Sequence, residues 1–343
     1  MNQPRVTLRD IAAAAGLHFS TVSLALRDHP RISPGVRQKV KDIAQSMGYA
    51  PDPVLSALNA YRNSRKPAQY KSTVAWVDNW PADTRMRDQS TFEEYFQGAS
   101  QRARELGYEI EEFPLQVRGM TPARASHILH SRGIKGLLLA PQPDFGVELP
   151  LKYELFSSVT FGYSLMPQSF HLVTNHQFHT LMLSLRELQK LGYKRIGFFV
   201  HETVNDKVDS SYLSAYFFHC YKNPGVKHPE PVIIPRNTKA RGLLLDWWKK
   251  EKPEAIITSL AWETLEWLRE LGLEAPRDYG YVYLSVPLGS PMTGVYQSGP
   301  VIGRAAMDML AGLLQRGEVG HPETPMRLLV EGHWNAGTTV RQQ

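Results

Sequence analysis

The first fifty residues carry apolar positions at helical spacing, separated by short polar stretches. This pattern predicts three short amphipathic helices. The apolar face of the first helix consists of Leu8, Ile11, Ala12 and Ala15. Thr7 precedes it as a favourable N-cap, and Asp10, three residues later, has the spacing of a capping box. Gly16 interrupts the pattern where the chain must turn sharply into a second helix.

The second and third helices complete a small bundle. Val22, Ala25 and Leu26 are expected to face inward, with Val22 between the first two helices, as in a tight helix-turn-helix. Ser33 is expected to cap the third helix, with Pro34 at its first position, where proline is tolerated. The apolar face of the third helix consists of Val36, Val40, Ile43, Ala44 and Met47, and Gly48 ends it.

Residues 50–61 form a short amphipathic segment bracketed by prolines, and residues 63–71 are polar and basic. Alone, a helix of this length is not stable in water. The pattern is equally compatible with a plain linker that contains a nascent helix and with a helix that forms on binding.

From residue 73 onward the pattern changes to strands that alternate with helices. Strands are predicted at 73–77, 108–113, 136–141, 158–161, 195–200, 231–234, 255–258 and 279–284. Helices are predicted at 91–106, 122–132, 176–191, 210–222, 239–251 and 261–271. This alternation implies parallel strands with right-handed crossovers. There are too many elements for one compact sheet, so two α/β lobes are expected.

The positive charge of the chain is concentrated in the helical part. The formal net charge of the 343 residues is +6, and residues 1–66 carry all of it, with ten Lys and Arg against four Asp. That asymmetry is the electrostatic footprint of a surface that binds a phosphate backbone. A solvated face with charges clustered by chance is the alternative.

Cysteine usage and hydropathy indicate the compartment. Cys220 is the only cysteine, which fits a reducing compartment. Its aromatic surroundings predict a small, buried apolar residue. There is no apolar run of the signal-peptide type at the N-terminus and no stretch of membrane-spanning length. We therefore expect a cytoplasmic protein.

Four spaced motifs carry a resemblance to a known family. They are V-T-L-x-D-I-A-x-x-A-G at 6–16, S-T-V-S-x-A-L at 20–26, I-S-P-x-V-R-x-K-V at 32–40 and G-Y-x-P-x-x-V at 48–54. In this order they resemble the head of the lactose/galactose-repressor (LacI/GalR) family of bacterial transcriptional regulators. Weaker matches extend the resemblance over the rest of the chain, among them L-x-x-L-G-Y-K-R-I-G-F at 188–198 and I-G-x-x-A-M-D-M-L at 302–310.

The resemblance implies an N-terminal all-α helix-turn-helix head with a hinge helix, followed by a two-lobe α/β core. It places the DNA-binding domain at 1–49, the hinge helix and linker at 50–66, and the effector-binding and dimerisation core at 67–343. That core resembles type I periplasmic binding proteins, with a ligand cleft between the lobes and three strands that cross over.

The resemblance also assigns a role to the hinge. In the family the hinge helix folds on operator DNA and pairs with its partner in the minor groove. Leu58 matches the leucine that is wedged between base pairs, and Val54 and Leu55 would pack the two hinges together. Asp52 departs from the uncharged polar residue usual there, and its carboxylate would repel phosphates.

Motif position also gives the expected DNA contacts. The base-facing candidates are His18, Phe19, Ser20 and Leu24. The phosphate or sugar contacts are Thr7, Thr21, Ser23, Arg27, Arg31 and Ser33. Leu24 stands where many members have arginine and Phe19 lacks a hydroxyl, so neither can make a bidentate bond to guanine. Base contacts are therefore expected from His18 and Ser20, and packing inside the head is the alternative for Phe19.

The cleft is where the sequence departs most from the family. Sugar-binding members usually place an Asp, an Arg and an Asn-Asp pair around the ligand. The matching positions here carry Gly162, Tyr212, Ser259-Leu260 and, for a late Asp, Ser285. The effector-binding candidates are Trp80, Tyr163, Tyr212, Trp262 and Ser285. Aromatic faces can stack on a sugar ring or an apolar ligand, but lobe-lobe packing is an alternative for each.

We therefore expect a homodimeric transcriptional regulator that acts as a repressor and binds a pseudo-palindromic double-stranded DNA operator. A small-molecule effector would control it, and a sugar follows only from family analogy. The alternatives are a regulator that has lost its effector response and a solute-binding protein with the same core fold. An enzyme is disfavoured because no phosphate-binding loop, nucleophile turn or other catalytic constellation is present.

No metal and no cofactor are expected. His176 and His179 lie three residues apart on a predicted helix, with His171 upstream. Two imidazoles at that spacing could share an ion, but no cysteine or carboxylate completes a ligand set in the local sequence. Solvent-facing histidines are therefore the preferred interpretation.

Overall fold

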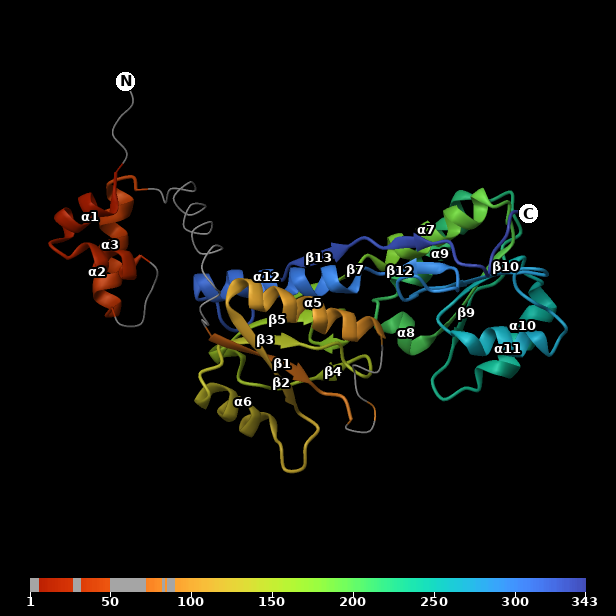
Figure 1. Ribbon diagram of the computed structural model, residues 1–343, viewed down its shortest axis with the longest axis horizontal. Coiled ribbons are helices and arrows are strands. Elements are labelled where there is room, and N and C mark those ends of the chain that lie inside the picture. Colours follow the sequence, from red (N-terminus) through yellow and green to blue (C-terminus); the bar gives the residue numbers. More distant parts are fainter. Residues whose placement is uncertain (1–5, 27–31, 50–71, 82–83, 85–89) are drawn as a thin grey trace, which may run out of the picture. The chain divides into compact units, whose positions relative to one another are not determined.

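The computed structural model describes residues 6–26, 32–49, 72–81, 84 and 90–343. These residues belong to two compact units, 1–69 with 315–317 and 70–314 with 318–343. We call the described residues within 6–49 the head and those within 72–343 the core (Figure 1). The predicted domain boundaries fall within residues 50–71, outside the described residues, and stay predictions.

The head contains three helices, as predicted: α1 (Leu8–Ala15), α2 (Phe19–Ala25) and α3 (Pro34–Ser46). The capping box is confirmed, because the Asp10 carboxylate accepts from the Thr7 backbone N–H at 2.7 Å and the Thr7 hydroxyl accepts from the Asp10 N–H at 3.4 Å. Gly16 has φ 67°, the left-handed conformation that the turn requires. Ser33 occupies the N-cap position of α3, but its side chain makes no capping hydrogen bond, so the predicted side-chain cap is wrong.

A very small core stabilises the head. Its buried side chains are Ile11, Ala12, Ala15, Val22, Ala25, Val40 and Ala44. Four of these are alanines, which let the helices approach closely. Val22, completely buried, is the larger side chain that α2 contributes, as the sequence predicts.

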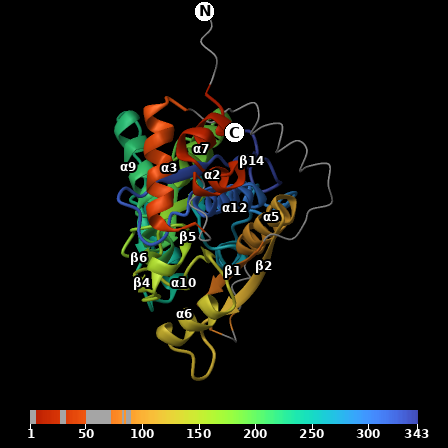
Figure 2. The same ribbon diagram turned by 90° about the vertical axis from the view of Figure 1, so that its left-hand side faces the viewer.

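The first lobe of the core is built on a parallel six-stranded sheet. Its order is β13 (Arg327–Val330), β7 (His171–Asn175), β5 (Ser157–Phe161), β3 (Gly136–Leu139), β1 (Ser72–Asp78) and β2 (Tyr108–Pro114). Helices α5 (Ser90–Leu106) and α12 (Gly299–Arg316) cover one face, and α6 (Pro122–Ser131) covers the other (Figures 1 and 2). Side chains of β1 alternate between the two faces: Trp76 packs with α5 and α12, and Val77 packs with α6.

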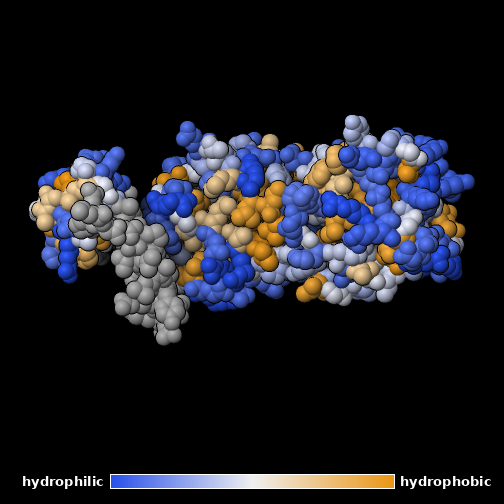
Figure 3. Space-filling model, turned by 90° about the horizontal axis from the view of Figure 1, so that it is seen from above, coloured by the Kyte–Doolittle hydropathy of each residue, from blue (hydrophilic) through white to orange (hydrophobic). Residues whose placement is uncertain are grey.

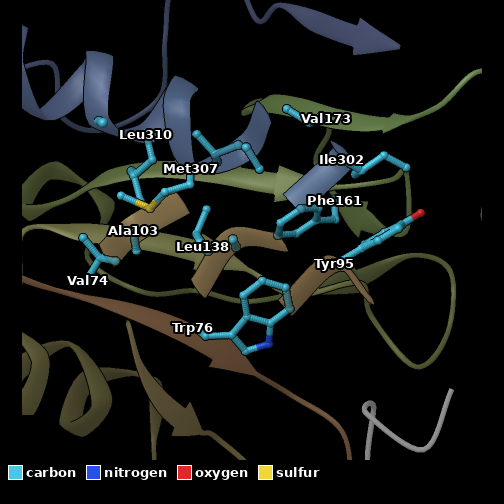
Figure 4. Close-up of a cluster of buried hydrophobic side chains, with 14 of the residues drawn as sticks. Val74, Trp76, Tyr95, Ala103, Leu138, Phe161, Val173, Ile302, Met307 and Leu310 are labelled. Carbon is cyan, nitrogen blue, oxygen red and sulfur yellow. The ribbon is translucent and has the colours of Figure 1, made fainter. Parts of the chain in front are cut away.

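Helices α5 and α12 approach each other at two glycines. A Cβ atom at Gly303 of α12 would clash with the backbone oxygen of Tyr95, and one at Gly98 of α5 would clash with that of Pro300. This approach lets α12 place Ile302, Met307 and Leu310 against the sheet, where they meet the aromatic cluster of Trp76 and Phe161 (Figure 4).

The second lobe repeats this architecture. Its sheet order is β14 (His333–Asn335), β12 (Gly294–Tyr296), β11 (Gly280–Tyr283), β10 (Ala255–Thr258), β8 (Ile196–His201) and β9 (Val232–Ile234). Only β14 runs antiparallel to its neighbour. The helices are α7 (Gln177–Lys190) and α9 (Ser211–Lys222) on one face, and α10 (Ala240–Glu251) and α11 (Trp262–Arg269) on the other.

The chain crosses between the lobes three times, from β7 to α7, from β12 to α12 and from β13 to β14. The predicted two-lobe α/β class with three crossings is therefore confirmed. The sequence analysis did not assign β7, β12, α12, β13 or β14, which flank these crossings. It also missed the short helix α8 (Glu202–Asp206), the 3-10 helix Tyr153–Leu155, and the small pair β4 (Val147–Glu148) and β6 (Leu165–Met166). Within the described residues, no helix has the length and apolar character needed to span a membrane.

Candidate functional site

The outer side of α2 presents the residues predicted to face DNA bases. His18 and Ser20 are exposed, and Phe19 is 46 % exposed, so Phe19 is not a core residue of the head. Thr21, Ser23 and Leu24 are partly exposed. The helix therefore offers a short, mixed surface of imidazole, hydroxyl and apolar groups.

His18 has a defined role at the start of α2. It is the N-cap residue, and its Nδ1 atom accepts from the Ser20 backbone N–H at 3.4 Å and lies 2.8 Å from the Ser20 hydroxyl. With Nδ1 as acceptor, the hydrogen of the neutral imidazole lies on Nε2. The head therefore presents an N–H donor at the first turn of the helix.

The predicted phosphate contacts are less uniform. Ser33 is exposed, whereas the Thr7 hydroxyl already donates to the Asp10 carboxylate at 2.7 Å. The remaining DNA-contact candidates Arg27, Arg31, Leu55 and Leu58 lie outside the described residues. Described basic residues of the head are Arg9, Arg37, Lys39 and Lys41.

A cavity of about 550 Å³ lies between the two lobes of the core. Segments that follow β1, β3, β5 and β7 line it from the first lobe, together with the start of α5. Segments that follow β8, β10, β11 and β12 line it from the second. The carboxyl ends of parallel strands are where ligands bind in open α/β folds. This cavity is therefore the candidate ligand cleft.

Four of the five effector-binding candidates line this cleft: Trp80, Tyr212, Trp262 and Ser285. Tyr163 does not, although its neighbour Gly162 does. The indole N–H of Trp80 donates to the Pro141 carbonyl at 2.7 Å, which fixes the ring against the first lobe. The Ser285 hydroxyl lies 3.0 Å from that of Thr91, so these two residues connect the lobes.

Aromatic and neutral polar groups form most of the lining. Burial raises the pKa of Tyr212 to about 12, so its hydroxyl stays neutral, and it accepts from the Gln297 amide at 3.4 Å. Asn175 is 3 % exposed, and a hydrogen bond from its side chain to the Tyr212 hydroxyl opposes the rise in the pKa of that tyrosine.

The sequence analysis missed Lys207, which lies directly after α8 and also lines the cleft. Its ammonium group donates to the Pro143 carbonyl at 3.2 Å and lies 5.5 Å from the centre of the Trp80 ring. Burial lowers its pKa to about 8, and the Asp144 charge opposes that shift. No local motif marks this lysine, because only the folded chain brings the segment after β8 to the first lobe.

The histidine pair has a distant partner. The rings of His176 and His179 stack at 3.8 Å, and His179 Nδ1 lies 2.9 Å from the Glu331 carboxylate. The sequence argument considered only the local sequence, and the carboxylate that completes this group, Glu331, lies more than 150 residues further along the chain. Together these residues join two of the three crossings, after β7 and after β13.

Cys220 is only partly buried, rather than fully buried as expected. Burial raises the pKa of its thiol. A thiol that is disfavoured as a thiolate is chemically quiet, so the structure gives this residue no role in either site.

Comparisons with known proteins agree with both units. Residues 7–52 match the family model "Bacterial regulatory proteins, lacI family", and residues 185–333 match "Periplasmic binding protein-like domain". No curated protein sequence matches the chain.

Three solved structures illustrate the likeness of fold. The complex of the transcriptional regulator CelR with cellobiose is 20 % identical with a TM-score of 0.62, over 98 % of this chain and 100 % of that one. The Lac repressor dimer bound to operator and the anti-inducer ONPF is 17 % identical with a TM-score of 0.56, over 98 % and 100 %. A LacI-family regulator from Silicibacter pomeroyi is 20 % identical with a TM-score of 0.54, over 98 % and 99 %.

A helix-turn-helix head and a two-lobe core of the periplasmic binding protein type define a class, the DNA-binding transcriptional regulators with an attached ligand-binding fold. Within that class, residues 7–52 belong to the lacI family of bacterial regulatory proteins. The family resemblance and the fold class expected from the sequence are thereby confirmed.

Proposed function

We propose that this regulator is a sequence-specific repressor that binds a pseudo-palindromic operator as a homodimer and responds to a small molecule in its cleft. The observation that carries the proposal is the exposed, chemically mixed face of α2 on a bundle with the family's helix-turn-helix motif. Because the operator is chromosomal DNA, the site of action is the cytoplasm.

The head reads bases in the major groove through α2. His18 supplies an N–H donor, which suits guanine O6 or N7, adenine N7 or thymine O4. Ser20 can donate or accept, and Phe19 offers an apolar surface to a thymine methyl group. Thr21 and Ser23 are the phosphate candidates on the same helix.

Sequence-specific binding is tested by using the full chain to select duplexes from a randomised library. We expect enrichment of a pseudo-palindrome with half-sites about one helical turn apart. Selected sequences without two-fold symmetry would contradict the dimeric mode. A pool that stays random after repeated rounds would contradict sequence-specific binding altogether.

The second copy is proposed from operator symmetry and from the related Lac repressor structure, which is a dimer bound to operator. The single chain also leaves apolar side chains of α12 and β13 exposed, among them Val301, Leu328 and Leu329. Figure 3 shows an apolar area on the face of the core that is seen from above. Sedimentation equilibrium should give twice the mass of the chain. A purely monomeric protein at all concentrations would contradict the homodimer.

The hinge is proposed from the sequence, since residues 50–66 lie outside the described residues. Leu58 is the candidate wedge in the minor groove, and Leu55 the candidate contact between hinges. Leu58→Ala should weaken binding to the selected operator and reduce its bending. Unchanged affinity in a gel-shift titration would count against this assignment.

Ligand control is proposed from the contacts that join the lobes. Lys207 and Ser285 of the second lobe bond to Pro143 and Thr91 of the first. A ligand that binds one arrangement of the lobes more tightly than another shifts their equilibrium, and the same coupling then appears in DNA affinity. The bound cellobiose of CelR favours a carbohydrate among the effectors to test.

A further inference from the structure

The described lining of the cleft contains few charged side chains. Among the described residues that line it, Lys207 is the only one with a charged side chain, and no carboxylate or guanidinium group faces the cavity. The other polar groups are hydroxyls and amides, such as those of Thr91, Asn175 and Gln297. The cavity is therefore built around a single positive charge.

Among the residues that the structure describes, no anionic group pairs with that charge. Within the described part of the chain, no carboxylate oxygen lies at ion-pair distance from Lys207 Nζ, and the Pro143 carbonyl is its one hydrogen-bond acceptor. Asp144, whose charge acts on Lys207, is held by Arg236 at 3.1 Å. Lys207 is partly buried, and a charged group withdrawn from water is stabilised by pairing with an opposite charge.

Aromatic rings surround the ammonium group. It lies 5.5 Å from the Trp80 ring centre and 5.9 Å from that of Phe92, within cation–π range. Trp262 lines the same cavity from the second lobe and is 54 % exposed, so its ring is accessible. Flat aromatic faces of this kind stack on the face of a sugar or aromatic ring.

We propose that the cleft binds a ring-bearing acid, whose carboxylate or phosphate pairs with Lys207 and whose ring stacks on the tryptophans. The cavity of about 550 Å³ admits a ligand of mono- to disaccharide size. This inference rests on the proposed function, since it names the chemical class of the ligand in the same cleft.

The same contact supplies a means of regulation. Lys207 belongs to the second lobe, but its ammonium group donates to a carbonyl of the first. An anion that takes this hydrogen bond replaces a contact between lobes with a contact to ligand. The acid therefore binds the two arrangements of the lobes unequally, which is the requirement for coupling to DNA.

The test compares matched neutral and acidic ligands on the full chain. Glucose, glucuronate, glucose 6-phosphate, cellobiose, cyclohexanol and benzoate, together with a wider panel of neutral and acidic metabolites, are titrated while tryptophan fluorescence is followed. Wild type is compared with Lys207→Met, which keeps the apolar stem, and Lys207→Arg, which keeps the charge. Lys249→Met, at an exposed lysine of α10, is the matched control.

We expect the ligands that bind to be acids, with affinity reduced at least about tenfold by Lys207→Met and largely retained in Lys207→Arg and Lys249→Met. Carboxylates and phosphates in the panel decide which anion is preferred. Thermal unfolding of each unliganded variant shows that the core is folded.

Two results would overturn the inference. If neutral ligands bind best, or acids bind Lys207→Met as tightly as wild type, the cleft is a ligand site but not one for acids. If no ligand of either class binds at millimolar concentration while DNA selection succeeds, ligand control itself fails and only the DNA-binding function stands.

Discussion

The head and the cleft carry their specificity in different ways. In the head, a few side chains on one short helix project outward from a bundle with seven buried apolar residues. In the cleft, segments that follow eight strands of two large lobes surround a cavity. The DNA-contacting residues of the head can therefore be predicted from a continuous sequence motif. The ligand-contacting residues of the cleft come from positions far apart in the chain.

The substitution with the largest expected effect unfolds the head and leaves the core folded. Val22→Asp buries a charge where Val22 is completely enclosed, at a cost of several kcal/mol. Because the core of the head is so small, we expect this loss of free energy to unfold the head. DNA binding should be abolished in a gel-shift titration, while the main unfolding transition of the core is unchanged.

Ala13→Asp, at an exposed position of α1, is the matched control and should retain most binding. Normal DNA affinity in Val22→Asp would show that the helical bundle is not the DNA-binding unit.

The reciprocal change acts on the core. Gly303→Ala introduces a methyl group against the Tyr95 carbonyl, where α12 and α5 meet backbone to backbone. Such overpacking costs about 1–3 kcal/mol, and calorimetry should show a lower melting temperature of the core. Gly242→Ala in α10, where an added Cβ meets open space, should be neutral or slightly stabilising. Equal effects of the two substitutions would contradict the close approach of α5 and α12.

The third prediction concerns base reading. His18→Asn keeps a residue that can cap α2 but moves the donor away from the position of Nε2. Binding to the selected operator should weaken about five- to tenfold, with little change on non-specific duplex. His18→Ala also loses the contact to the Ser20 N–H and should weaken both. If His18→Asn lowers the affinity for all DNA sequences equally, His18 stabilises the head and does not recognise a base.

The smallest effect is electrostatic. The hydrogen bonds from Thr7 lower the pKa of Asp10, so this carboxylate stabilises the folded head above the pKa it has in the unfolded chain. That stabilisation is lost as the pH falls through the lowered pKa of the folded state. Asp10→Asn should remove this part of the acid sensitivity of α1, measured by circular dichroism of the head's transition. An unchanged acid profile would show that the capping box does not contribute.

The same contrast explains what could be predicted from the sequence. The three head helices, the capping box and the Gly16 turn follow from local patterns, because each depends on residues within one or two turns. Alternating strands and helices likewise gave the two-lobe fold. The strands β12 and β14 escaped because they are only three residues long, and β13 because its partner β7 is far away in the chain. β7 was missed although it pairs with β5, which is close to it in the chain.

The cleft was only partly predictable for the same physical reason. Trp80, Tyr212, Trp262 and Ser285 follow strand ends or begin helices, where family motifs give a guide. Lys207 and Glu331 have no local signal, since the partners of the partly buried Lys207, Trp80 and Pro143, lie in the other lobe. Conversely, Tyr163 has a suitable side chain beside a strand end but does not line the cavity.

The central claim is that the outward face of α2 recognises a particular DNA sequence. The most direct measurement is the affinity of the full chain for its selected duplex and for a shuffled duplex of equal composition, at physiological ionic strength and across a salt titration. The account predicts a preference of about a thousandfold or more for the selected duplex, with affinity for both falling steeply as salt rises. Equal affinity for the two duplexes, or affinity that does not change with salt, would contradict it.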